Sequence, residues 1–249
     1  MSTNSIAGFL SDLKFFAIIL VVALIFRTTA FGMYHIPSES MLPTLAVGDR
    51  IAVSKFAYGY SRHSLPFSVA PDFATETGRI FSKTPERGDI IVFKHPRTKE
   101  NYIKRVVGLP GETIELRDGR LYINGELTHR ETIQDLRYRE HRGRVVDVRA
   151  FQEALVQVPG KAKPHAIYER SDRYGTDNFK PTIVPDGHLF VLGDNRDNSL
   201  DSRFFERGVG FLPMDHVVGK AIALPFSFHQ CRQETGLNCL DRPWFSALQ

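Results

Sequence analysis

The chain has 249 residues, of which 42% are hydrophobic and 24% charged, and its formal net charge is +4. This length allows one or two domains with a buried core, and the composition excludes a disordered chain, a collagen-like repeat and a small cysteine-stapled scaffold. The weakly basic balance contains no long run of like charge, so it predicts no nucleic-acid partner. Cys231 and Cys239 lack a second cysteine pair or a paired histidine; they indicate one disulfide or two free thiols rather than a zinc site.

An apolar segment near the N-terminus, Phe15 to Phe26, contains twelve residues without a polar side chain and is bounded by Lys14 and Arg27. As a helix it covers about 18 Å of a hydrocarbon core that is roughly 30 Å thick. If the two cations reach the headgroups, the helix extends from Phe9 to Tyr34 and spans the bilayer. We expect a retained anchor within residues 1–34, with a cleaved signal peptide or a buried helix as alternatives. The flanking cations balance and do not orient the segment.

The remainder of the chain, from residue 35, predicts mostly antiparallel β-structure. Short runs of alternating or β-branched residues are separated by Gly, Pro and Asp. Two of these runs flank Asp118-Gly119, which predicts a tight hairpin. The runs are Arg50–Val53, Asp89–Phe93, Tyr102–Val107, Thr113–Leu116, Arg120–Ile123, His188–Leu192 and Val217–Leu224.

Two stretches lack this strand pattern. Residues 60–85 show poor periodicity and predict a long surface loop. Residues from about 127 to 180 predict a solvent-exposed insertion, in which arginines are interleaved with acids between positions 129 and 150 and Val145–Val156 has amphipathic helical character. A nucleic-acid patch would have those arginines without the compensating acids.

Three segments concentrate polar reactive groups among turn residues, where functional side chains tend to lie: Ile36–Leu45, Asn101–Gly111 and Gly193–Arg203. In the first, flanking prolines restrain a loop that holds Ser38 and Ser40 close together. A serine acts as a nucleophile only when a base takes its proton. The histidines have no acid placed to orient them, so an ordinary catalytic triad is unsupported.

Lys104 offers a different base. Strand alternation places either Lys104 or Arg105 on a face with apolar neighbours. Burial lowers the pKa of a lysine, and the neutral amine can then act as a general base. The alternative is a surface lysine whose stem lies along the sheet while its ammonium reaches water.

The third segment brings acids and arginines together directly after an apolar strand. Charge-assisted hydrogen bonds among them would hold a tight loop. A calcium loop of the EF-hand type is the competing interpretation. It fits poorly because, counted from Asp194, the third position is Arg196 and the sixth is Ser199 instead of glycine.

Together the segments resemble bacterial type I signal peptidases, which are membrane-anchored serine proteases with a Ser/Lys dyad. The resemblance covers about a third of the chain, follows the family's order after the anchor segment and rests on PSESMLPTL, RGDIIVF, YIKRVVGLPGE and GDNRDNSLDSR. It implies an antiparallel β-sheet catalytic domain at residues 35–249 and an endopeptidase that removes signal peptides from exported preproteins. It also implies cleavage after small residues of the Ala-X-Ala type, an acyl-enzyme intermediate, and no metal or organic cofactor.

The resemblance assigns roles to individual residues. Ser40 is similar to the nucleophile and Lys104 to the general base, Ser38 to the oxyanion donor that works with the backbone N–H of Ser40, and Ser199 to the residue that orients the lysine. The ion pairs that stiffen the site correspond to Asp194, Arg105, Asp201 and Arg203. The shallow pockets for small substrate side chains correspond to Tyr34, Ile36, Pro37, Met41, Tyr102 and Ile103.

Glu39 departs from the family pattern, which commonly has glycine between the two serines. A positive φ would strain a glutamate there, and we expect Glu39 to point to solvent and the site to remain functional. The resemblance further implies a single-pass protein of the bacterial inner membrane, with a cytoplasmic N-terminus and signal peptides and the lipid bilayer as partners. The catalytic domain then lies in an oxidising exterior, which favours a disulfide between Cys231 and Cys239.

Two other functions are weighed against this one. A soluble self-cleaving Ser/Lys protein of the phage-repressor type needs an N-terminal DNA-binding domain, and residues 1–35 are too few and too apolar for it. A non-enzymatic, membrane-anchored β module would keep its function after Ser40→Ala or Lys104→Met.

Overall fold

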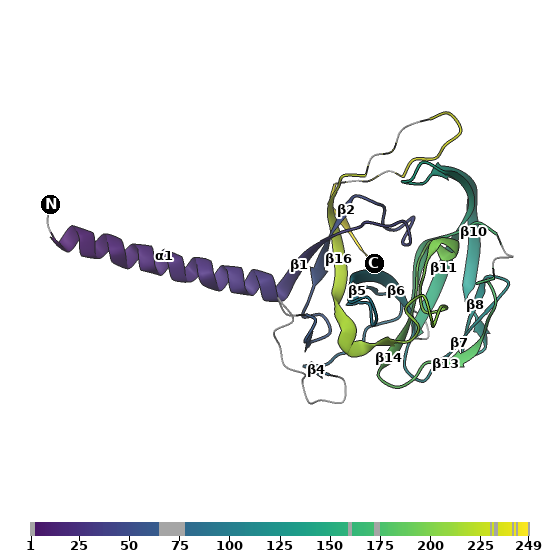
Figure 1. Cartoon of the computed structure of the whole chain (residues 1–249), viewed down its shortest axis with the longest axis horizontal. Coiled ribbons are helices and arrows are strands. Elements are labelled where there is room, and N and C mark those ends of the chain that lie inside the picture. The colour runs from purple at the N-terminus through teal and green to yellow at the C-terminus, as the bar shows by residue number, and fades with distance from the viewer. Residues whose placement is uncertain are drawn as a thin grey trace.

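The chain forms one long helix followed by a β domain (Figure 1). The computed structural model describes residues 3–64, 78–158, 161–171, 175–229, 231, 234–240, 242 and 244–248. Residues 65–77 of the expected surface loop and parts of the expected insertion, 159–160 and 172–174, lie outside the described residues.

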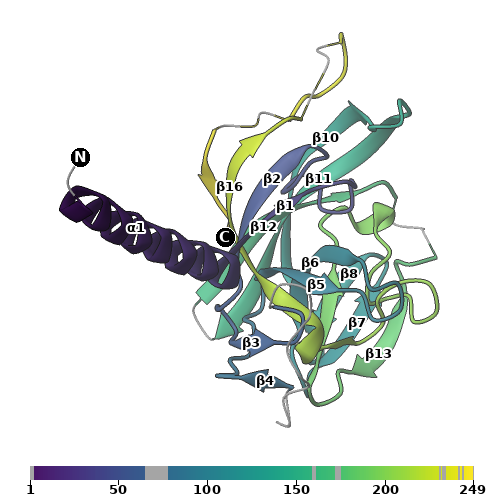
Figure 2. The same cartoon turned by 60° about the vertical axis from the view of Figure 1, so that its left-hand side comes forward.

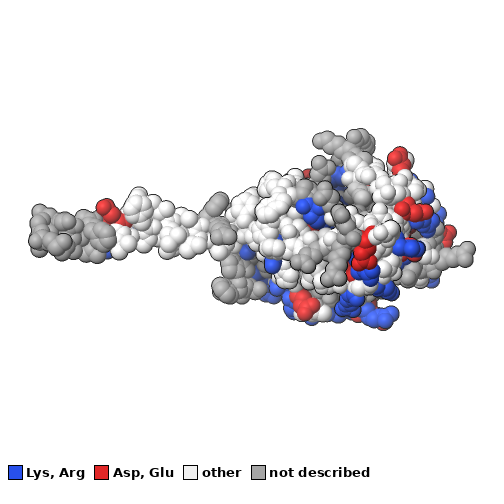
Figure 3. Space-filling model, turned by 90° about the horizontal axis from the view of Figure 1, so that it is seen from above, with Lys and Arg blue, Asp and Glu red and all other residues white. Residues whose placement is uncertain are grey.

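Helix α1 (Thr3–Ala30) projects away from the β domain, and its described side chains from 12 to 24 are exposed (Figure 2). The stretch Asp12–Ala30 is long and apolar enough to cross a bilayer, by length and composition. The part of α1 that Figure 3 colours is mostly without charge, whereas acidic and basic side chains are interspersed over the domain. The helix ends before the expected Tyr34, because Phe31–His35 pairs as strand β1 with β2.

The central sheet has eight antiparallel strands, in the order β1-β2-β16-β5-β6-β14-β15, with β17 paired to β16. This confirms the predicted antiparallel β fold. The strands are β1 (Phe31–His35), β2 (Asp49–Ser54), β5 (Ile90–Lys94), β6 (Asn101–Gly108), β14 (His188–Leu192), β15 (Leu212–Pro213), β16 (Val217–Ser227) and β17 (Ser246–Ala247).

Three smaller sheets surround the central one, in the orders β3-β4, β13-β7-β8-β9 and β10-β11-β12. The hairpin predicted at Asp118-Gly119 joins β7 to β8, and both turn residues have positive φ, as a type I′ turn requires. The strands are β3 (Tyr60–Ser61), β4 (Arg79–Ile80), β7 (Thr113–Arg117), β8 (Arg120–Ile123), β9 (Glu126–Leu127), β10 (His129–Arg139), β11 (Val145–Val158), β12 (Lys161–Glu169) and β13 (Phe179–Ile183); η2 (Arg196–Asn198) and η3 (Met214–His216) are short 3₁₀ turns.

The helix expected at Val145–Val156 is wrong, because this segment lies within β11 and pairs with both β10 and β12. Its side chains alternate between buried and exposed over Val145–Ala150, which is the period of a strand. The insertion is also less exposed than expected: one face of it buries Leu136, Tyr138 and Val148 in a cluster with residues that follow Ser40. The insertion is therefore a wall of the active-site region.

Candidate active site

Ser40 lies in a turn between β1 and β2, which we call the Ser40 loop, residues 36–48. Two backbone hydrogen bonds close the ends of this loop: Ile36 N donates to Asp49 O at 2.9 Å, and Gly48 N donates to Ile36 O at 3.0 Å. Met41 and Leu45 are fully buried in the core of the central sheet and anchor the loop from below. The nucleophile candidate therefore sits on a rigid support.

Lys104 approaches Ser40 from β6. Its Nζ donates hydrogen bonds to Ser40 Oγ at 2.6 Å and to the carbonyl oxygen of Ile103 at 2.9 Å. The side chain is 3% exposed, and burial lowers its pKa from 10.5 to about 8, against the opposing charges of Asp201 and Asp194. A lysine in this state is neutral in part at neutral pH and can accept a proton.

The two other predicted serines lie close to this pair. Ser38 Oγ is 3.4 Å from Ser40 Oγ and is exposed to the groove. Ser199 is buried, and its Oγ has no hydrogen-bond partner among the described residues, so the structure does not join it to Lys104. Its role in orienting the lysine stays a prediction.

The segment 193–203 is held against the Ser40 loop by contacts that sequence reasoning did not single out. Asn195 N donates to Ser40 O, and Asn195 Nδ2 donates to Glu39 O, both at 3.1 Å. Gly193 permits the close approach, because a Cβ there would lie 2.3 Å from Ser199 Oγ and 2.5 Å from Ser40 O. Gly193 and Asn195 both belong to the GDNRDNSLDSR motif. The sequence therefore pointed to their segment, but it could not predict their contacts with the Ser40 loop.

The predicted ion pairs are present and buried. Arg105 forms a two-pronged pair with Asp194, with both N···O distances 2.8 Å, and Arg203 pairs with Asp201 at 2.9 Å. Burial alone would raise the pKa of the Asp194 carboxyl, but the Arg105 guanidinium outweighs it and keeps that pKa below its ordinary value. The Asp201 carboxylate also accepts a hydrogen bond from Gly193 N at 3.1 Å. These pairs fix the segment that carries Ser199.

A groove of about 920 Å³ opens above the Ser40–Lys104 pair. Of the residues expected to bind substrate, Pro37, Tyr102 and Ile103 line it. Ile36 and Met41 lie in the core cluster and do not line the groove, while Tyr34 packs against that cluster. Ile36 and Met41 therefore affect the floor of the groove only indirectly, through the residues that pack on them.

The edge of β6 beside Lys104 is open. Strand β5 pairs with β6 from Asn101 to Arg105, but β14 covers the other edge only at Arg105, Val106 and Gly108. Within the described part of the chain, no strand pairs with this edge between Asn101 and Lys104. It therefore offers backbone donors and acceptors next to the reactive serine.

Glu39 does not point to solvent as expected. It is half-buried, and its Oε1 accepts a hydrogen bond of 2.6 Å from the backbone N–H of His141 at the β10–β11 turn. Burial raises the pKa of its carboxyl. Its φ is not among the positive values of the described non-glycine residues, so the backbone accommodates a glutamate without strain.

One group among the described residues has the spacing of metal ligands. The ligand atoms of His63, Asp215 and His216 lie within 4.8 Å of one another, and His216 Nδ1 is 2.9 Å from the carbonyl oxygen of Lys94. None of the three lines the catalytic groove. The cluster therefore belongs to another part of the domain.

A model of the signal peptidase family, peptidase S26, matches residues 10–226. A signal peptidase I of Pseudomonas aeruginosa is 39% identical over 223 residues, which cover 86% of this chain and 72% of that protein. The chain belongs to this family. A signal peptidase I of Rickettsia bellii is 39% identical over 248 residues, covering 95% of this chain and 81% of that protein. A crystal structure of a signal peptidase I from Enterococcus faecalis V583 is 32% identical, covers 55% of this chain and 97% of that chain, and has a TM-score of 0.31.

The family resemblance predicted from the sequence is thus confirmed, and the chain is a serine endopeptidase of this family. Family membership and the apolar α1 also agree with a membrane-anchored protein. The roles of the individual residues rest on the geometry above and are argued next.

Proposed function

We propose that this protein removes signal peptides from exported preproteins, with Ser40 as the nucleophile and Lys104 as the general base. The observation that carries the proposal is the buried hydrogen bond of 2.6 Å between Lys104 Nζ and Ser40 Oγ. Family membership supports the substrate class. An exposed, fully charged lysine would form a similar contact, but it would be a far weaker base at neutral pH.

The reaction follows from these positions. When the Lys104 amine is neutral, the hydrogen bond reverses and Ser40 Oγ–H donates to Nζ. Lys104 takes this proton as Oγ attacks the carbonyl carbon before the mature chain, while the Ser38 hydroxyl and the Ser40 N–H donate to the oxyanion. Lys104 then gives the proton to the leaving amine and activates the water that hydrolyses the acyl-enzyme. Ser199, whose buried hydroxyl has no hydrogen-bond partner among the described residues, is free to accept from Lys104 and orients the lysine during these steps.

Specificity for Ala-X-Ala sequences is supported by the open edge of β6. A substrate that adds to the edge at Asn101–Ile103 is an extended strand, so its first and third residues before the scissile bond face the same side. On that side the groove floor lies above a packed apolar core. A shallow pocket over such a core rejects bulky side chains by overlap and accepts alanine.

Anchoring in the bilayer places the site near its substrate. We propose an anchor in residues 1–34 and a catalytic domain in residues 35–249, with β1 as the connection between them. The N-terminus is cytoplasmic, and the domain lies on the outer face of the bacterial inner membrane. Ser40 follows the end of α1 by one short strand and a turn, so a signal peptide in the same membrane meets the site at a high effective concentration.

Cleavage by the detergent-solubilised full chain tests the proposal. A preprotein whose signal ends in Ala-X-Ala is incubated with wild type, Ser40→Ala and Lys104→Met, and product masses are measured. We expect wild type alone to cleave after the final alanine. Ser82→Ala and Lys180→Met, at exposed positions, are the matched controls and should cleave like wild type. Equal cleavage by the two active-site variants would remove Ser40 and Lys104 from their roles.

A further inference from the structure

A second cavity, of about 670 Å³, opens beside the catalytic groove and has no part in the mechanism above. Its floor contains Leu42 and Ala46 from the Ser40 loop, and one wall contains Tyr138 from β10. Its roof contains Leu237 and Leu240 from the C-terminal strap, by which we mean the described residues between 228 and 242. The lining combines apolar side chains with a few polar ones, such as Glu39 and Arg139, as ligand-binding pockets do.

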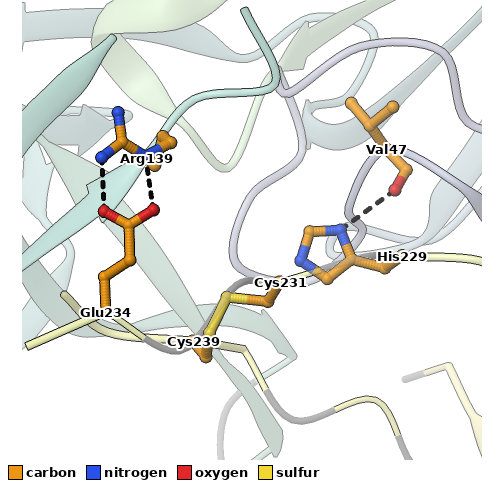
Figure 4. Close-up of a disulfide and its surroundings, with 6 residues drawn as sticks. All are labelled: Val47, Arg139, His229, Cys231, Glu234 and Cys239. Atoms are coloured by element: carbon orange, nitrogen blue, oxygen red, sulfur yellow. Dashed lines mark hydrogen bonds and ion pairs between the residues drawn. A yellow bond between two sulfur atoms is a disulfide. The ribbon is translucent and has the colours of Figure 1, made fainter. Parts of the chain in front are cut away.

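The strap is tied down on both sides of the cavity. A disulfide within the strap joins Cys231 to Cys239 and closes it into a loop, and Arg139 of β10 ties this loop to the domain through an ion pair with Glu234 at 2.5 Å (Figure 4). On the other side, His229 Nδ1 is 3.1 Å from Val47 O. Arg242 also donates hydrogen bonds of 3.0 and 3.1 Å to carbonyl oxygens of the Ser40 loop. The cavity therefore has walls held in place by several contacts.

The cavity and the catalytic groove adjoin, because Glu39, Val47, Glu140 and His141 line both. Glu39 stands at the junction, directly beside Ser40 in the chain. Its bond to the backbone of His141 holds the carboxylate at this point. A chain that extends from the groove into the cavity would cross these shared residues, Glu39 among them.

Glu39 is also the acid at this junction that lacks a cationic side-chain partner. Glu140 pairs with Arg144 and Arg170, whereas among the described residues the Glu39 carboxylate forms no ion pair: it accepts a hydrogen bond from the backbone N–H of His141 and feels Arg170 only as a more distant charge. A substrate lysine or arginine would supply the missing cation. A substrate acid would meet repulsion from the same carboxylate.

The position of the membrane decides which part of the substrate enters. A signal peptide stays on the side of the bilayer-spanning α1, while β10 lies on the far side of the domain from α1 in Figure 1. Building on the proposed function, we propose that the cavity under the strap binds the mature chain just after the scissile bond, and that Glu39 selects basic over acidic residues there.

Peptide cleavage by the full chain in detergent tests this proposal. Peptides share one Ala-X-Ala signal end and carry either one or six residues after the scissile bond; in the longer set, lysine or glutamate occupies the first, second or third of these positions. We expect the longer peptides to have a kcat/KM about tenfold higher, which corresponds to about 1.4 kcal/mol. The lysine peptide should exceed its glutamate counterpart by about fivefold at one position, the upper range for a partly exposed ion pair.

Three variants distinguish an effect of the Glu39 charge from an effect of the substitution on folding. Glu39→Gln keeps an oxygen acceptor for His141 N and should bring the lysine-to-glutamate ratio to about one, mainly through KM. Glu126→Gln, at an exposed position on β9, should leave the ratio as in wild type. Leu237→Trp, which would fill the cavity and does not line the catalytic groove, should lower kcat/KM for long peptides and leave short ones unaffected.

The outcomes distinguish the two proposals. Cleavage without dependence on length or charge, or a charge ratio that survives Glu39→Gln, overturns the role of the cavity while the signal peptidase activity stands. Failure of wild type to cleave any peptide overturns the proposed function and this inference with it.

Discussion

Lys104→Met should abolish cleavage and yet raise the free energy of unfolding at neutral pH. Lys104 is 3% exposed, and burial lowers its pKa from 10.5 to about 8. Each pKa unit corresponds to about 1.4 kcal/mol, so the protonated lysine destabilises the folded state by about 3 kcal/mol. Methionine also loses two hydrogen bonds, to Ser40 Oγ and Ile103 O, each contributing about 1 kcal/mol. The expected net gain at pH 7 is about 1 kcal/mol.

Proton linkage gives the direction of the pH dependence. The folded pKa of Lys104 lies below the unfolded value, so the unfolded chain binds more protons between pH 8 and 10.5. Wild-type stability therefore rises with pH through this window, whereas the penalty is fully present below about pH 8. Because the penalty falls by about 1.4 kcal/mol per pH unit above pH 8, the advantage of the methionine variant should shrink as pH rises and change sign at about pH 9.

Urea unfolding of both proteins in one detergent, followed by circular dichroism at pH 7, 8.5 and 10, measures this difference. Lys180→Met, at an exposed position on β13, controls for the substitution itself and should unfold like wild type. A methionine variant that is less stable at pH 7, or a stability difference that does not vary with pH, would refute the argument that burial lowers the pKa of Lys104.

The remaining predictions concern the base and its surroundings. The kcat/KM of wild type should rise about tenfold per pH unit below pH 8 and level off above it, since only neutral Lys104 accepts the proton; a flat profile between pH 6 and 9 would contradict this. Asp194→Asn removes the carboxylate that faces the buried Arg105 guanidinium and should lower the free energy of unfolding by about 3–5 kcal/mol in urea, against no change for the exposed Asp186→Asn; a loss under about 1 kcal/mol would argue against the ion pair. Gly193→Ala should lower kcat by about 100-fold, because its Cβ would lie 2.5 Å from Ser40 O and displace the nucleophile, while Gly175→Ala, which has open space, should act like wild type.

Local sequence signals were sufficient for much of the fold and for the reactive pair. The Asp118-Gly119 turn and the β-branched runs specify their structures within a few residues, so hairpin and strands were predictable. Lys104 could be chosen because a cation inside an apolar strand is unusual whatever its partner is. Its partner Ser40, 64 positions away, was identified through the family motif.

The errors share a non-local cause. Val145–Val156 reads as an amphipathic helix by itself, and only pairing with β10 and β12 makes it a strand. The surroundings of Glu39 depend on His141, which is 102 positions away. The end of α1 was misplaced because β2, which pairs with Phe31–His35, decides where the helix stops. Short-range patterns carry no information about such distant neighbours.

The ties between the Ser40 loop and Asn195 have a consequence for biosynthesis. The nucleophile, its base and the segment that braces them come from three distant parts of the chain, and Asn195 reaches back 156 positions to Glu39. In the topology proposed above, a nascent chain that has inserted its anchor and exported its first strands therefore has a serine but no assembled site. Contacts of such long range form late in folding. With that topology, the site assembles only after most of residues 35–249 have crossed the membrane, when the N-terminal helix already spans it.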